Sequence, residues 1–138
     1  MSILIDTGFF VALANKDDSN HTRAIELIED LLKGKWGTRI TTDYILDEAI
    51  TVTWVRTRKK DLVSSVYNFI LGKEAFVLLQ PFPKELIPRA WELFQTYTEP
   101  KRPLSFTDCT TLAHLKNKNI TQLLSFDKDF NGLVSRIH

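Results

Sequence analysis

Short strand-like runs alternate with longer segments of helical periodicity along this chain, and this alternation most constrains its fold. The strand-like runs lie at residues 3–5, 38–41, 75–80 and 120–126, with a possible edge strand at residues 133–137. The segments between them repeat apolar residues at intervals of three and four, as on one face of a helix. These segments lie at residues 9–14, 24–32, 43–56, 62–70, 86–97 and 105–118. Strands alternating with helices predict a three-layer α/β/α fold with a mostly parallel central sheet.

The length and composition fit one folded domain over residues 1–138. Of its 138 residues, 43% are hydrophobic and 25% are charged, as is usual for globular proteins. The net charge of +1 permits nucleic-acid binding through a local patch but supplies no overall steering field. The N-terminus has no basic segment followed by a long apolar stretch, and no apolar stretch reaches the roughly 20 residues that span a bilayer. We therefore expect a soluble, cytoplasmic protein without membrane contact.

Four carboxylates that are far apart in the sequence are the main candidates for a functional site: Asp6, Glu48, Asp108 and Asp127. Asp6 follows the run at residues 3–5 and Asp127 follows the run ending at residue 126, so both are expected at the carboxyl edge of the sheet. Ligands bind at that edge in open α/β sheets. If the four side chains meet, their mutual repulsion requires a cation. Hard divalent cations such as Mg²⁺ and Mn²⁺ prefer carboxylate oxygens.

Each acid also has an ordinary structural interpretation. An Asp after a strand is commonly a turn or cap residue. Asp108 is the fourth residue of Ser-Phe-Thr-Asp, the capping-box pattern at the start of a helix. Asp127 and Asp129 could be turn and cap residues, or a metal ligand and its support. Spacing alone leaves the choice between Asp47 and Glu48 open.

At these residues the chain resembles the PIN-domain ribonucleases, and among them the VapC-like toxins of prokaryotic toxin–antitoxin pairs. The resemblance spans essentially the whole chain and rests on four short motifs: Ile-Asp-Thr-Gly, Thr-Thr-Asp-Tyr-Ile-Leu-Asp-Glu-Ala, Leu-Ser-Phe-Thr-Asp-Cys and Leu-Leu-Ser-Phe-Asp-Lys-Asp-Phe. Each motif is weak alone, but their order and spacing are fairly specific.

The resemblance implies an acidic metal site made of Asp6, Glu48, Asp108 and Asp127, and it selects Glu48 over Asp47. It places Thr7 and Ser125 beside the site and gives Asp129 a supporting role. It further implies a homodimer and an inhibitory antitoxin protein that covers the pocket. Cys109 stands where the family often has alanine, a small-for-small difference.

The leading hypothesis is therefore an endoribonuclease that uses Mg²⁺ or Mn²⁺ to hydrolyse RNA phosphodiester bonds by in-line attack of water. An aspartyl phosphatase also begins with a strand followed by Asp, but its second Asp two positions later is Gly8 here. A catalytically silent PIN-like module that binds nucleic acid or protein is the non-enzymatic alternative.

Histidines and basic residues complete the candidates. His21 and His114 are predicted at a helix start and on a helix surface, too dispersed to form a catalytic group with His138. Two basic runs, residues 56–60 and 101–102, could be solvated chain segments or could contact the phosphates of RNA.

Overall fold

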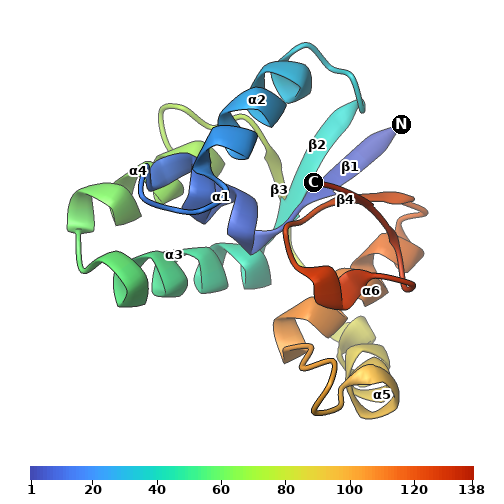
Figure 1. The fold of residues 1–138 in the computed structure, drawn as a ribbon. Coiled ribbons are helices and arrows are strands. Elements are labelled where there is room, and N and C mark those ends of the chain that lie inside the picture. The colour runs from blue at the N-terminus through green and yellow to red at the C-terminus, as the bar shows by residue number, and fades with distance from the viewer.

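The structure is a computed structural model that describes all residues from 1 to 138, and its centre is a five-stranded parallel sheet (Figure 1). The strand order is β3-β2-β1-β4-β5, and every neighbouring pair is parallel. The strands are β1 (Ser2–Ile5), β2 (Thr38–Thr42), β3 (Leu78–Gln80), β4 (Gln122–Leu124) and β5 (Ser135–Ile137).

Six α-helices cover the sheet in two groups (Figure 1). The helices of the first group contact one another, and they are α1 (Thr7–Ala14), α2 (His21–Leu32), α3 (Asp43–Thr57) and α4 (Lys60–Ile70). The second group pairs α5 (Ile87–Tyr97) with α6 (Phe106–Asn117). Short 3₁₀ turns occur at Lys84–Leu86 and Lys128–Phe130. The predicted three-layer α/β/α fold is confirmed, and no helix is long and apolar enough to cross a membrane.

The order of the strands reverses beside β1. The chain proceeds from β1 through β2 to β3 on one side, then returns to place β4 and β5 on the other side. The β1/β4 pair is therefore the switch point of the sheet, where ligands bind in doubly wound folds. Asp6 continues this pairing, since its N–H donates to the Leu124 carbonyl at 3.0 Å.

The core forms around the central strand. Ile3, Leu4 and Ile5 of β1 are completely buried, as expected of a strand whose sheet is covered on both faces. Phe9 and Phe10 of α1 are also fully buried, and both pack edge-on or tilted against Phe76. Burial of each large apolar side chain stabilises the fold by about 1.5–3 kcal/mol, so this packing fixes the end of β1 firmly.

The observed strands β3 and β4 are shorter than the runs predicted at residues 75–80 and 120–126. Residues before β4 instead terminate α6: Asn119 adopts a left-handed φ of 54°, and the Ile120 N–H donates to the Leu115 carbonyl at 2.9 Å. Apolar composition alone does not distinguish residues that end a helix from residues that pair in a sheet.

Candidate metal centre

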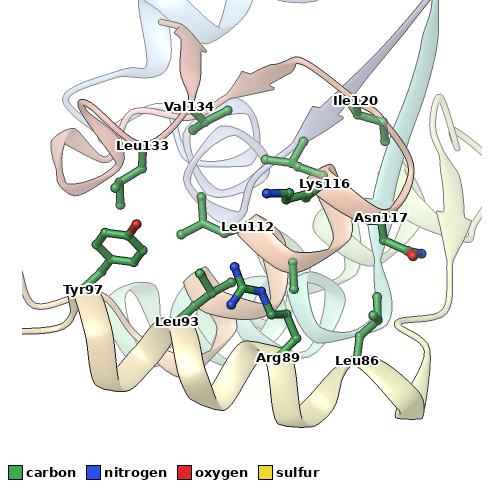
Figure 2. A pocket seen from close by; sticks show the side chains of 12 residues that line it. Leu86, Arg89, Leu93, Tyr97, Leu112, Lys116, Asn117, Ile120, Leu133 and Val134 are labelled. Atoms are coloured by element: carbon green, nitrogen blue, oxygen red, sulfur yellow. The ribbon is translucent and has the colours of Figure 1, made fainter.

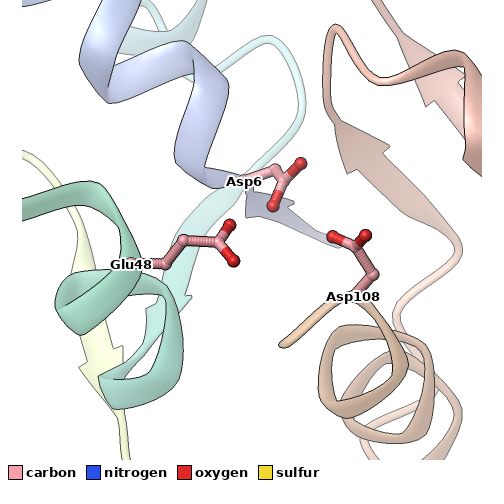
Figure 3. A group of neighbouring side chains, drawn as sticks. All are labelled: Asp6, Glu48 and Asp108. Carbon is pink, nitrogen blue, oxygen red and sulfur yellow. The ribbon is translucent and has the colours of Figure 1, made fainter. Parts of the chain in front are cut away.

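Three carboxylates from different elements meet at the β1/β4 switch point. Asp6 lies between β1 and α1, Glu48 on α3, and Asp108 in the first turn of α6. One oxygen of each lies within 4.8 Å of the others. Figure 3 shows the three side chains turned toward a common space.

Asp6 is held rigidly but keeps one oxygen free. Its backbone is extended at the N-cap of α1, and the side chain is only 4% exposed. The Ser125 hydroxyl donates to Asp6 Oδ2 at 2.7 Å, whereas the buried Oδ1 has no hydrogen-bond partner. A buried carboxylate oxygen without a partner is costly, and a bound cation would satisfy it.

Ser125 connects Asp6 to the segment after β4. Its Oγ also accepts a hydrogen bond from the Asp127 N–H at 3.1 Å. Asp127 Oδ1 in turn accepts from the Asp129 N–H at 2.9 Å. Asp127 thus lines the same pocket as the three acids but is outside the group whose oxygens lie within 4.8 Å. Asp129 contacts Asp127 through this hydrogen bond and does not itself line the pocket.

Asp108 both caps a helix and belongs to the acidic group. Its Oδ2 accepts from the Ser105 N–H at 2.8 Å, and its own N–H donates to Ser105 Oγ at 3.0 Å. The capping-box prediction is therefore confirmed. Since Oδ1 takes no part in that motif, the structural and metal-binding interpretations of Asp108 are compatible.

Glu48 faces the pocket and Asp47 does not. The Thr42 hydroxyl begins α3 by accepting the Ile45 N–H at 3.3 Å, and the packing of the helix sets which residues face inward. Glu48 is half-buried and lines the pocket, while Asp47 is exposed and does not. Of the two acids that spacing left open, the structure places Glu48 in the pocket.

Burial and mutual repulsion make the group difficult to ionise. Desolvation, followed by smaller contributions from Glu48 and Asp127, raises the pKa of Asp6 from 3.8 to about 6, although the Ser125 hydrogen bond opposes the shift. Desolvation and the charge on Asp6 raise the pKa of Asp108 from 3.8 to about 7. A divalent cation would reverse both effects by favouring the charged carboxylates.

The donor set fits a hard divalent cation. Its donors are all carboxylate oxygens, as Mg²⁺ and Mn²⁺ prefer. Two oxygens on opposite sides of an Mg²⁺ ion bound at about 2.1 Å are about 4.2 Å apart, close to the 4.8 Å limit on the group. No lysine or histidine lines the pocket, and Arg56 is the single basic residue beside its five acidic ones.

The acids line a polar pocket of about 390 Å³ at the switch point. A larger pocket of about 510 Å³ lies between α5, α6 and the segment before β5, as Figure 2 shows. Nine of the twelve residues that line this larger pocket are hydrophobic, and none is acidic. The larger pocket therefore lacks the carboxylates that a hard cation prefers, and the candidate metal site is the smaller one.

The structure also locates Thr7, His114 and two loop residues relative to the acidic pocket. Thr7 lines the acidic pocket as expected, and its buried hydroxyl oxygen has no hydrogen-bond partner. The surface position predicted for His114 is wrong, because its side chain is completely buried and Nε2 contacts Gln80 Oε1 at 2.9 Å. Sequence reasoning missed Asp18 and Asn20 as pocket residues, since no motif marks the loop before α2.

Comparison with known proteins finds matches that span nearly the whole chain. The PIN domain family matches residues 3–134. The 23S rRNA-specific endonuclease VapC20 of Mycobacterium tuberculosis is 27% identical over 134 residues, covering 94% of this chain and 92% of the relative. A VapC ribonuclease of Archaeoglobus fulgidus is 28% identical over 132 residues, covering 95% of this chain and 80% of the relative.

Solved structures share the fold. The crystal structure of Mycobacterium tuberculosis VapC20, described as a Sarcin-Ricin loop cleaving toxin, superposes with a TM-score of 0.78 at 26% identity over 93% of this chain and 92% of that chain. VapBC2 from Rickettsia felis, solved with a promoter DNA fragment, gives 0.68 at 16% identity over 99% and 98% of the two chains. Since the family match covers nearly every residue, the chain belongs to the PIN domain family.

Proposed function

We propose that this protein is a metal-dependent endoribonuclease that acts as the toxin of a toxin–antitoxin pair. One observation carries the proposal: three carboxylates converge within 4.8 Å at the switch point, around a buried Asp6 oxygen without a partner. The family match and the VapC relatives support the ribonuclease activity. The description of one structural relative as a toxin supports the biological role.

In this proposal Asp6, Glu48 and Asp108 bind Mg²⁺ or Mn²⁺. Asp127 completes the four-carboxylate site from its more distant position. The bound ion would polarise a phosphoryl oxygen and lower the pKa of a water molecule that attacks the phosphorus in line. Ser125 orients Asp6 through the 2.7 Å hydrogen bond, and the Asp129 N–H orients Asp127. Thr7 lies beside Asp6 with a hydroxyl available to a ligand.

The charge of the pocket explains why cleavage would depend on the metal. Five acidic residues line it: Asp6, Asp18, Glu48, Asp108 and Asp127. Without a cation, these groups repel the phosphates of RNA. A divalent ion therefore both neutralises the pocket and attracts the substrate, so chelation should abolish productive binding as well as chemistry.

The proposal extends to assembly and location. We expect a homodimer, an antitoxin protein that inhibits the enzyme by covering the acidic pocket, and a cytoplasmic site of action. The sedimentation coefficient of the purified protein tests the homodimer. The antitoxin is tested with a protein that copurifies with this chain. That protein should prevent RNA cleavage and should prevent Mn²⁺ from binding in the acidic pocket.

Incubation of total RNA, including ribosomal RNA, with the purified protein tests the activity. We expect internal cuts in Mg²⁺ or Mn²⁺ and none in EDTA or with the Asp6→Asn variant. RNA binding without any cutting would favour the catalytically silent module. Cutting that survives both EDTA and Asp6→Asn would refute the metal-site mechanism.

A further inference from the structure

Arg56 is the only basic residue that lines the acidic pocket. It lies on α3 at the eighth position after Glu48, with Val52 between them, and all three residues face the pocket. Residues spaced by four lie on one helical face. At a rise of about 1.5 Å per residue, Arg56 is about 12 Å along the helix axis from Glu48. It therefore lies about two helical turns beyond Glu48, at the side of the pocket away from that acid.

The guanidinium of Arg56 is available to a ligand. Its side chain is 61% exposed, and its nearest acidic partner is Asp18, whose Oδ2 lies 3.9 Å from Nη1. That separation is too long for a good hydrogen bond. Asp18 itself is held in the loop because its Oδ1 accepts the Asn20 N–H at 2.8 Å. The contact with Asp18 thus leaves the hydrogen-bonding capacity of Arg56 available to a ligand in the pocket.

Two other members of the basic runs, Arg58 and Arg102, are engaged elsewhere. The Arg58 guanidinium lies over the Trp54 ring, 5.5 Å from its centroid. Arg102 donates to the Asn131 carbonyl at 3.2 Å. Neither residue lines the acidic pocket. The structure therefore separates Arg56 from the neighbours that sequence alone grouped with it.

We propose that Arg56 binds an RNA phosphate next to the scissile one and so fixes the strand across the three acids. This inference rests on the proposed ribonuclease function. Arginine suits the role because its planar guanidinium donates two parallel hydrogen bonds to a phosphate. On RNA binding, Arg56 exchanges its weak contact with Asp18 for that phosphate.

Binding of a fluorescent single-stranded RNA tests the inference, with Ca²⁺ in place of Mn²⁺ as a hard cation for the carboxylates. Arg56→Gln should raise Kd about tenfold, the loss of one charge-assisted contact. It should also reduce the slope of log Kd against log salt by about 0.7, the value for one phosphate contact on a single strand. Arg56→Lys should restore the salt slope, because it keeps the charge.

Arg89→Gln is the matched control. Arg89 is also an exposed helical arginine beside a carboxylate, Glu92, but it lies on α5 away from the acidic pocket. Its replacement should leave Kd and the salt slope unchanged. In cleavage assays with Mn²⁺, Arg56→Gln should raise KM by more than it changes kcat.

Unchanged Kd and salt slope in Arg56→Gln would overturn the inference, as would an equal loss in Arg89→Gln. If the wild type cuts RNA while Arg56→Gln behaves like it, only this inference fails. If the wild type binds RNA but never cuts it, the proposed function fails, and the inference fails with it because no phosphate is then scissile. Absence of any RNA binding by the wild type would overturn both.

Discussion

Replacement of Asp6 by Asn should stabilise the metal-free protein while destroying its response to metal. Asn has nearly the same shape, and its amide oxygen can still accept the Ser125 hydrogen bond. The variant lacks only the buried negative charge. Because the pKa of Asp6 is raised from 3.8 to about 6, that charge destabilises the native state, and its removal should increase the free energy of unfolding.

The magnitude follows from proton linkage. The folded protein binds a proton at Asp6 more tightly than the unfolded chain does, so the wild type loses stability as pH rises from about 4 to 6 and the loss is complete above that range. The expected advantage of Asp6→Asn in EDTA is about 3 kcal/mol at pH 8 and about 0.5 kcal/mol at pH 4. For a domain of this size the pH 8 value corresponds to a rise in Tm of about 10 °C.

Thermal and urea denaturation at both pH values, with EDTA or Mn²⁺, measures these differences. Mn²⁺ at 100 times its Kd should stabilise the wild type by about 2.7 kcal/mol and leave Asp6→Asn unchanged. Asp47→Asn, which neutralises an exposed acid of α3 outside the pocket, is the control and should respond to Mn²⁺ like the wild type. The reasoning is refuted if Asp6→Asn is less stable than the wild type at pH 8 in EDTA, or if Mn²⁺ stabilises both equally.

Three further predictions concern neighbouring groups. Asp108→Asn keeps the helix cap and should raise the metal-free stability at pH 8. Asp108→Ala loses the cap and should be about 1 kcal/mol less stable than Asp108→Asn in urea denaturation. Equal stability of the two variants would contradict the capping role. Ser125→Ala should raise the pKa of Asp6 further, because it removes the hydrogen bond to that carboxylate. It should lower the free energy of unfolding at pH 8 by about 1–3 kcal/mol and reduce single-turnover RNA cleavage about tenfold. Unchanged cleavage would show that Ser125 does not position Asp6. Glu48→Gln should reduce cleavage by at least the roughly 10- to 100-fold that loss of a residue supporting a metal ligand costs, while Asp47→Asn cleaves normally. A larger loss in Asp47→Asn than in Glu48→Gln would show that Glu48 is not the ligand.

Much of the fold could be predicted from local sequence patterns. The run Ile3-Leu4-Ile5 predicts a buried strand, and these residues are completely buried in β1. The three-and-four spacing in residues 43–56 predicts a helix and matches α3, Asp43–Thr57. The order of the strands in the sheet is set by tertiary packing, which local patterns do not encode. The strand predicted at residues 120–126 is longer than β4 (Gln122–Leu124), because the first residues of the apolar run end α6 instead.

The candidate site was predictable only where its residues follow from local patterns and the topology of the sheet. Asp6 and Asp127 follow strands that lie side by side at the switch point, so their meeting follows from topology. Asp108 was ambiguous because one carboxylate can cap a helix with one oxygen and face a pocket with the other. Spacing could not select Glu48, because the face that α3 presents to the sheet depends on how the helix packs.

Residues without a motif were missed or misplaced. His114 was predicted on a surface, but α5 and the residues after β3 cover α6, and desolvation lowers the pKa of His114. The pocket position of Arg56 could have been found from its helical spacing after Glu48, once Glu48 was chosen. Asp18 reaches the pocket through a loop, where no periodicity applies.

End-group analysis of the cut RNA tests the central claim most directly. Attack by water held at the acidic metal site should leave a linear monophosphate on one side of each internal cut and a free hydroxyl on the other, in Mn²⁺ and never in EDTA. Attack by the neighbouring 2′-hydroxyl needs no metal and leaves a 2′,3′-cyclic phosphate. Cyclic ends, or linear ends produced equally in EDTA, would contradict a metal-dependent ribonuclease built on Asp6, Glu48, Asp108 and Asp127.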